Sequence, residues 1–255
     1  MEISEKDCII DILNMSYSAQ CGHIPSALSM VTYLLNIFDE NKICPKRFHF
    51  IFGKPFGSQA YYSIFSRLGW IESDISKFGS TNDNEWRYII QANNPVVTYI
   101  DESMGNCLAV ANGYAMAKKD TYINISDAAF QEGSIWEAIQ FAGAHKLEKI
   151  FMTVDYNGIQ ALGKTKDIND LGRLELKLKS FGWNVYICDG HNNKQIKKTI
   201  RKAFARYNKG NNGPIAILFK TQKGHGVKFM EDNTLWHYKT LSKEDLIKAI
   251  EEINV

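Results

Sequence analysis

The sequence contains no stretch that approaches the roughly 18 consecutive apolar residues of a membrane-spanning helix, so we expect no membrane anchor. Its five cysteines are scattered without the paired spacing of metal ligands, which argues against a disulfide framework or a zinc site and fits a reducing cytosol. The first residues, MEISEKDCIIDIL, are acidic and lack the pattern of a signal peptide. Together these absences predict a soluble, cytoplasmic protein.

The sequence also has little excess charge of either sign. A formal net charge of +2 is too small to favour binding to nucleic acid or to a membrane surface. The basic segment KQIKKTIRKAFAR (194–206) carries Ile196, Ile200 and Phe204 at helical spacing, so we interpret it as the solvent face of an amphipathic helix. No G-x-G-x-x-G follows a predicted strand, which disfavours a nucleotide-binding oxidoreductase.

Apolar strands alternate with amphipathic helices along the chain, which predicts an α/β fold with a mostly parallel sheet and helices on both faces. We expect strands at 48–52, 121–125, 149–154, 183–188 and 214–219. We expect helices at 5–19, 26–38, 58–68, 103–119, 132–146, 170–180, 193–207 and 242–253. Because no internal repeat or linker interrupts the sequence, residues 1–255 are predicted to form one domain.

Asp127 and Asn157 each stand just past the end of a predicted strand, with one helix between those strands. A right-handed crossover places such strands side by side, so both side chains are expected at the carboxyl edge of the sheet. Their oxygens suit a hard cation such as Mg²⁺ or Ca²⁺, and a helix starting near Phe130 offers N–H groups to an anion. The pattern is compatible with a metal-bridged diphosphate, and also with two turn residues that bind no metal.

Five segments, quoted with their residue numbers, resemble one known family, the transketolases. Residues 131–165, QEGSIWEAIQFAGAHKLEKIFMTVDYNGIQALGKT, resemble its diphosphate-binding region, in particular that of the amino-terminal subunit of split, two-subunit transketolases. GHIPSALSMVTYLL (22–35) is similar to the family's GHPGGSLS segment, and SMGNCLAVANGYAMAKK (103–119) resembles its GSLGQGLSIAVGMALA helix. DGHN (189–192) and KTQKGHGVKFMEDNTLWHYK (220–239) resemble its closing segments, DGHD and KGKGVSFMENNVEWHGK. The resemblance runs in the same order along nearly the whole chain.

The resemblance implies that this chain binds the diphosphate of thiamine diphosphate through a divalent metal, Mg²⁺ or Ca²⁺. The carboxylate of Asp127, the side-chain amide of Asn157 and the backbone carbonyl of Ile159 match the family's metal ligands. Ala128 matches a position where the backbone approaches a phosphate.

The resemblance also implies roles in substrate binding and catalysis. His23 and His237 match histidines that line the substrate channel and reach the reacting carbon, and His237 also contacts the cofactor. Glu132 matches a glutamate in an acidic relay that links paired active sites, and Met104 stands where a leucine supports the cofactor rings.

The sequence departs from the family at three places. Ser126 and Ala128 replace the glycines that flank the aspartate, and alanine would cost about 1 kcal/mol if its φ had to be positive. Pro55 replaces a histidine that contacts cofactor and substrate, and Asn93 or Asn94 replaces a second channel histidine. We therefore expect cofactor binding to persist while the donor or acceptor differs.

The implied activity is transfer of a two-carbon ketol unit from a ketose to an aldehyde or keto-sugar acceptor. In the family, a glutamate of the pyrimidine-binding half activates the cofactor, so we expect a separate partner chain and a heterotetramer of two copies of each subunit. Two alternatives stay open. One is a specialised relative that makes a branched sugar on a nucleotide-linked keto sugar, and the other is a non-catalytic regulatory paralogue.

Overall fold

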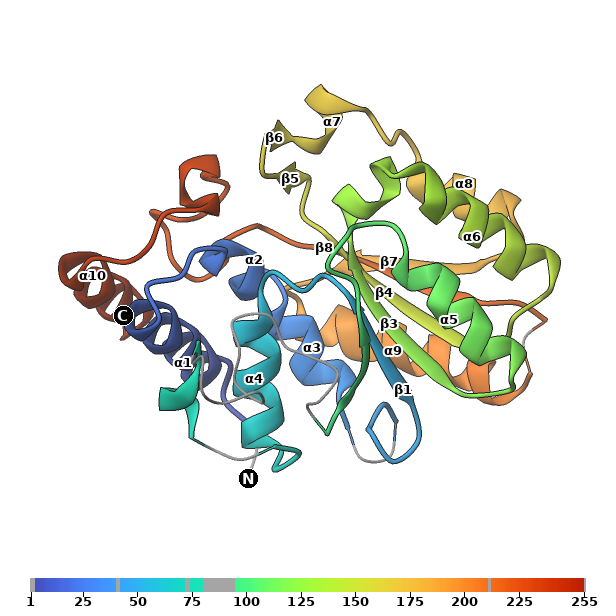
Figure 1. Cartoon of the computed structure of the whole chain (residues 1–255), viewed down its shortest axis with the longest axis horizontal. Helices are drawn as coiled ribbons and strands as arrows, with labels where there is room; N and C mark the ends of the chain where they lie inside the picture. The colour runs from blue at the N-terminus through green and yellow to red at the C-terminus, as the bar shows by residue number, and fades with distance from the viewer. Residues whose placement is uncertain (1–2, 40–41, 72–73, 80–94, 211, 255) are drawn as a thin grey trace.

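The computed structural model describes residues 3–39, 42–71, 74–79, 95–210 and 212–254. Its centre is a six-stranded sheet of parallel strands in the order β2-β1-β3-β4-β8-β7 (Figure 1). The strands are β1 (His49–Gly53), β2 (Val97–Ile100), β3 (Thr121–Ser126), β4 (Ile150–Tyr156), β7 (Asn184–Asp189) and β8 (Ile215–Lys220). This architecture confirms the predicted α/β fold with a parallel sheet.

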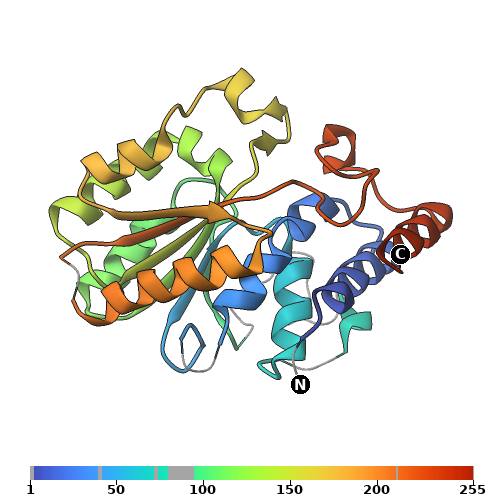
Figure 2. The same cartoon turned by 180° about the vertical axis from the view of Figure 1, so that it is seen from behind.

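Helices cover both faces of the sheet (Figure 1, Figure 2). One layer contains α3 (Val31–Ile37), α4 (Ser58–Arg67) and α9 (Asn193–Asn208). Beyond α4, α1 (Glu5–Ser18) and the short 3-10 helix η1 (Ile75–Lys77) pack on α4, and α10 (Lys243–Asn254) packs on α1. The other layer contains α5 (Cys107–Met116), α6 (Gly133–Ala144) and α8 (Leu174–Ser180). Within the described segments, no helix combines the length and the apolar character needed to cross a membrane.

Side chains of the central strands alternate between these two layers, which gives the sheet two separate hydrophobic clusters. Large aromatic side chains fill the cluster on the α3 and α9 side, among them Phe50, Tyr122, Phe151 and Phe219. Mostly aliphatic side chains fill the cluster on the α5 and α6 side, among them Ile51, Ile123, Met152 and Leu218. Burial on both faces explains why these strands are almost continuously apolar in sequence.

Because the strands are parallel, their carboxyl ends share one edge of the sheet, and several short elements gather there. They are α2 (Ile24–Leu28), η2 (Asp127–Gln131), β5 (Ile159–Gln160), β6 (Gly163–Lys164), α7 (Thr165–Ile168) and η3 (Thr234–His237). The β5–β6 hairpin, α7 and the segment around η3 project at the top of Figure 1. This edge is where open α/β folds bind ligands.

Several features differ from the sequence prediction, and the helices expected at 103–119 and 170–180 are shorter, beginning at Cys107 and Leu174. The helix expected at 26–38 is two helices, α2 and α3, and the hydroxyl of the intervening Ser29 donates to the Asp155 carboxylate at 2.7 Å. Strand β2 was not predicted, because it has only four residues and lies half-exposed at the sheet edge. The turn after β3 is the 3-10 helix η2, and α6 begins only at Gly133, not near Phe130.

Candidate functional site

A pocket of about 460 Å³ lies at the carboxyl edge of the sheet, bordered by α2, the β5–β6 hairpin and η3. Most of the predicted site residues line it, namely His23, Met104, Ala128, Asn157, Ile159 and His237. Asp127 is fully buried between the lining residues Ser126 and Ala128, and Glu132 lies outside the lining. The fold therefore gathers residues that lie far apart in the sequence around one cavity.

Asp127 follows β3 directly and faces the loop after β4. Its Oδ2 accepts hydrogen bonds from Gly158 N at 2.8 Å and Thr165 Oγ1 at 3.2 Å, and its Oδ1 accepts one from Ala128 N at 3.0 Å. Burial, together with the negative charge of Asp155, raises the pKa of Asp127 to about 6. Since a carboxylate offers about four lone-pair positions, these three bonds leave one for a further partner.

The turn after β4 places the two other predicted ligands beside Asp127. Gly158 has φ +71°, a conformation that favours glycine, and its N–H is the donor to Asp127. Asn157 Oδ1 accepts a hydrogen bond from Ile159 N at 2.9 Å, and Asn157 Nδ2 donates to Asp155 Oδ2 at 2.9 Å. The Asp127 carboxylate thus contacts the residue between Asn157 and Ile159.

A buried ion pair, which the sequence analysis missed, lies below this turn. Lys54 Nζ contacts the carboxylate of Asp155, and only 7% of Lys54 and 0% of Asp155 is exposed. Burial favours a raised pKa for Asp155, but the charge of Lys54 and hydrogen bonds from Lys54, Thr221 and Ser29 outweigh it and hold the pKa below its usual value. Asp155 is therefore negatively charged, and its ion pair holds Lys54, which lines the pocket, in place.

Lys223 is a second buried lysine that sequence reasoning did not single out, although it lies inside the KTQKGHG segment. Its Nζ lies 3.2 Å from the Ile159 carbonyl oxygen and 2.8 Å from His237 Nδ1. Burial and the charge of Lys54 lower the pKa of Lys223 to about 8. A protonated Lys223 donates to His237 Nδ1, so the proton of the neutral imidazole lies on Nε2.

The two predicted channel histidines lie together, although they are far apart in the sequence. His23 has φ +60°, and its N–H donates to the His237 carbonyl at 2.9 Å, while the two rings lie 4.7 Å apart. Burial and the charge of Lys223 lower the pKa of His23 to about 4 and that of His237 to about 3. Both imidazoles are therefore neutral near pH 7.

The altered flanks of Asp127 are accommodated without strain. Ala128 does not have a positive φ; it lies in η2 and donates its N–H to Asp127 Oδ1. The penalty of about 1 kcal/mol considered for a positive φ at this position therefore does not arise. Ser126, at the end of β3, has extended backbone at φ −93° and ψ 161°.

The segment after β1 carries the second departure from the family. Pro55 lines the pocket as expected, but the ring that stacks on His23 belongs to its neighbour Phe56. Counting the family's S-K-G-H from Gly53 and Lys54 also places Phe56 at the histidine, whereas the sequence analysis assigned Pro55. Asn93 and Asn94, the third departure, lie outside the described residues.

Met104 and Glu132 lie on two segments that pack against each other. Met104 lines the pocket with 44% of its surface exposed. Gly105 follows with φ +103°, and a Cβ there would lie 2.8 Å from Glu132 Cβ, so this turn packs closely against Glu132 at the start of α6. The fold therefore brings Glu132 close to the turn at Gly105, but Glu132 does not line the pocket.

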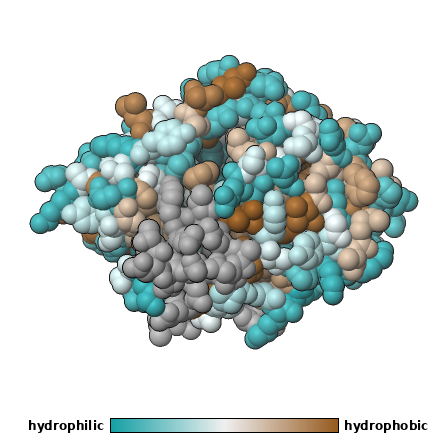
Figure 3. Space-filling view, viewed as in Figure 1, coloured by the Kyte–Doolittle hydropathy of each residue, from teal (hydrophilic) through white to brown (hydrophobic). Residues whose placement is uncertain are grey.

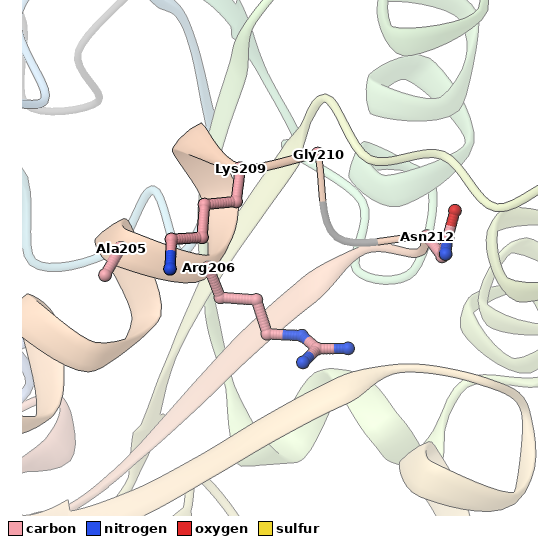
Figure 4. Close-up of a pocket in the computed structure, with 5 residues that line it drawn as sticks. All are labelled: Ala205, Arg206, Lys209, Gly210 and Asn212. Atoms are coloured by element: carbon pink, nitrogen blue, oxygen red, sulfur yellow. The ribbon is translucent and has the colours of Figure 1, made fainter.

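Another pocket, of about 310 Å³, lies at the end of α9 and is lined by Ala205, Arg206, Lys209, Gly210 and Asn212 (Figure 4). It precedes β8 and therefore lies at the amino edge of the sheet, opposite Asp127. Among the described residues that line it there is no carboxylate, histidine or cysteine, so it offers less chemistry than the pocket at the carboxyl edge.

Comparison with known proteins now identifies the family. Residues 93–253 match the family model described as transketolase, thiamine diphosphate binding domain, which is more than half of the chain. This chain belongs to the transketolase family. Its fold is also that of a solved transketolase, since the transketolase from Campylobacter jejuni superposes with a TM-score of 0.83 at 21% identity, covering 100% of this chain. The chain spans only 43% of that transketolase, so it corresponds to one part of the larger enzyme.

Relatives of similar length are subunits of transketolases. The apulose-4-phosphate transketolase subunit of Actinobacillus succinogenes is 28% identical over 258 residues, covering 96% of this chain and 91% of that protein. The 6-deoxy-6-sulfo-D-fructose transketolase subunit SqwG of a Clostridium species is 29% identical over 246 residues, covering 91% and 88%. The expected resemblance to the amino-terminal subunit of split transketolases is confirmed.

Proposed function

We propose that this chain is the diphosphate- and metal-binding subunit of a split transketolase that transfers two-carbon ketol units. The observation that carries the proposal is the buried Asp127 carboxylate, hydrogen-bonded to Gly158 between Asn157 and Ile159 under an open pocket. The name of each relative states a sugar and the words transketolase subunit. These names support the same activity and the need for a second chain.

The donor set suits Mg²⁺ or Ca²⁺. In the described part of the chain no group of three His, Cys, Asp or Glu could hold a metal, so a cation here would depend on amide and carbonyl oxygens beside one carboxylate. Asp127, Asn157 and Ile159 supply those three kinds of oxygen, and hard divalent cations accept all three. Each oxygen group keeps a lone pair beyond its recorded hydrogen bonds.

Charge balance also supports a metal. The site residues Asp127 and Asp155 carry two negative charges, and Lys54 and Lys223 carry two positive charges, so the protein groups roughly cancel. A diphosphate would therefore enter without a compensating charge unless a divalent cation entered with it. This is the reason for which we propose that diphosphate and metal bind together.

The cofactor, when bound, supplies the carbon nucleophile that attacks a ketose carbonyl. The protein's part is to hold the substrate oxygens. His237 presents a neutral ring with its proton on Nε2, because Lys223 occupies Nδ1, so it can donate a hydrogen bond to an oxygen of the reacting carbon. His23, beside it, is held by its backbone bond to His237.

A partner chain is proposed to cover the pocket and supply the pyrimidine-binding half. Large apolar side chains stand exposed on the two loops that flank the pocket, with Leu162 86% and Leu235 79% exposed, and apolar residues are visible at the tips of both loops (Figure 3). Exposed apolar groups beside a cofactor pocket favour contact with another protein. We propose a heterotetramer of two such pairs, in which Glu132 connects the two sites.

We further propose a cytoplasmic location, which is supported by the five cysteines, all within the described residues, forming no disulfide with one another.

The test uses the purified chain, thiamine diphosphate and Mg²⁺, with and without its partner chain. We expect no ketose cleavage by the chain alone and turnover by the assembled complex. Calorimetry of the complex should show cofactor binding that disappears when EDTA removes the metal. Robust turnover by the chain alone would contradict the split arrangement, and a complex without metal-dependent binding would favour the non-catalytic paralogue.

A further inference from the structure

One wall of the pocket is aromatic. The Phe56 ring is stacked on the His23 imidazole, with centroids 4.6 Å apart and planes inclined by 23°. Tyr238 packs edge-on against His23 at 5.3 Å and against His237 at 4.7 Å, and all four residues line the cavity. Phe56 is 38% exposed, so part of its ring surface faces the space that a substrate would occupy.

The backbone holds Phe56 in this place. Lys54 Nζ donates to the Ser26 carbonyl at 2.9 Å, and the Pro55 carbonyl accepts a hydrogen bond from Ser58 Oγ at 2.6 Å. Gly57 has φ +119°, and a Cβ there would lie only 3.2 Å from Ala27 N, so the segment packs tightly on α2. Phe56 therefore stands between two fixed neighbours, and its ring is a built part of the wall.

Within this wall Phe56 is the ring without a polar group, whereas His23, His237 and Tyr238 each carry one. A phenyl ring has no hydrogen-bond donor or acceptor, so a substrate hydroxyl pressed against it loses a bond to water without replacement. A C–H or methyl group in the same place gains from leaving water. A polar contact remains available in the same pocket at His237 Nε2, because Lys223 occupies Nδ1.

We propose that Phe56 selects the acceptor, favouring an aldehyde or ketone that carries a C–H or methyl group where a common sugar carries a hydroxyl. The acceptor class is thus a deoxy sugar or deoxy aldehyde. This inference rests on the proposed function, because it assigns a substrate preference to the same pocket.

The test compares two acceptors that differ by one oxygen, D-lactaldehyde and D-glyceraldehyde, in the assembled complex. Hydroxypyruvate serves as donor. The bond to its carboxylate breaks and CO₂ leaves, the ketol carbon bonds to the aldehyde carbon, and the resulting alkoxide takes up one proton. The measured quantity is the ratio of kcat/KM for lactaldehyde to kcat/KM for glyceraldehyde.

Phe56→Asn and Phe56→Leu form a matched pair, because Asn and Leu have similar shapes and opposite polarity. We expect the wild-type ratio to exceed one, the Asn variant to lower it about tenfold, and the Leu variant to keep it within about threefold. Thermal unfolding and cofactor binding of each variant complex show whether it is folded. If Phe56→Asn does not assemble, Phe56→His replaces it as the polar variant.

The outcomes separate this inference from the proposed function. A wild-type complex that turns over neither acceptor would overturn both. A complex that turns over both acceptors, with a ratio that Phe56→Asn and Phe56→His leave unchanged, would overturn the assignment of Phe56 alone. A wild-type preference for glyceraldehyde would also overturn it.

Discussion

The two ends of the pocket differ in the contacts that their side chains make. We call the end around Asp127 and Asp155 the cofactor end, after its proposed role, and the end around Phe56, His23 and Tyr238 the substrate end. At the cofactor end, Asp127 and Asp155 are fully buried, and every recorded bond joins them to a backbone N–H, a hydroxyl, an amide or a lysine. At the substrate end, rings pack against rings, and Phe56 and Tyr238 are 38% and 67% exposed.

The difference shows which part of such a site can vary. A buried charge tolerates few neighbours, because losing one partner leaves an uncompensated ion. In a wall of packed aromatic rings, one ring can replace another with little loss of stability. Phe56 can therefore occupy the position where the family has a histidine. We therefore expect the end around Asp127 and Asp155 to keep its chemistry and the aromatic end to carry any change in substrate.

The largest expected effect comes from removing the positive charge at the cofactor end. Lys54→Met leaves the buried Asp155 carboxylate without its cation, so we expect the free energy of unfolding to fall by about 3–5 kcal/mol. Urea unfolding measures this change. The exposed Lys197→Met on α9 is the control and should stay within about 0.5 kcal/mol of wild type. A loss below about 1 kcal/mol for Lys54→Met would mean that the ion pair does not stabilise this end.

The second effect concerns cofactor affinity. Asp127→Asn replaces the anionic oxygen proposed to bind the metal, so we expect the affinity of the complex for thiamine diphosphate with Mg²⁺ to fall about 100-fold, or about 2.7 kcal/mol. Calorimetry measures it. Asp170→Asn is the control, since Asp170 is exposed and its Oδ1 accepts a hydrogen bond from Gly172 N. An unchanged affinity for Asp127→Asn would remove the basis of the proposed metal site.

The third effect is a pH dependence of stability at the substrate end. The pKa of His23 is lowered to about 4 in the folded state, against 6.5 for the free group, so the unfolded chain binds the proton first as the pH falls. The neutral His23 ring therefore contributes fully to the free energy of unfolding above pH 6.5, and this contribution is lost as the pH falls toward 4.

His23→Asn tests this, because Asn tolerates the positive φ. Between about pH 7 and pH 5, without cofactor or metal, the variant should lose about 1–2 kcal/mol less stability than wild type in urea unfolding. His145→Asn, at the exposed end of α6, should follow the wild-type dependence. If His23→Asn matches wild type as well, His23 is not held neutral by the wall.

The smallest effect concerns the altered flank of Asp127. Restoring glycine through Ala128→Gly relieves no strain, because Ala128 does not have a positive φ. We expect cofactor affinity to change less than about threefold and stability to fall by about 0.5–1 kcal/mol from the added chain flexibility. A clear gain in affinity would show that the alanine Cβ obstructs the diphosphate.

Much of the fold and part of the site follow from sequence. The alternation of strands and helices predicted the sheet, and the positions of Asp127 and Asn157 predicted that they follow neighbouring strands, where Asp127 contacts Gly158, the residue after Asn157. Strand β2 escaped prediction because four half-exposed residues carry no clear periodicity. The ion pair of Lys54 escaped prediction because its partner, Asp155, lies 101 residues away.

The sequence by itself determined the α/β class, the family and the chemical types placed at the sheet edge, because strand periodicity and local turns are properties of neighbouring residues. Only the tertiary structure decided which of those groups touch. It paired Lys54 with Asp155, turned Lys223 toward His237, stacked Phe56 on His23 and left Ala128 unstrained. These contacts join distant segments, and packing around the whole sheet fixes their geometry.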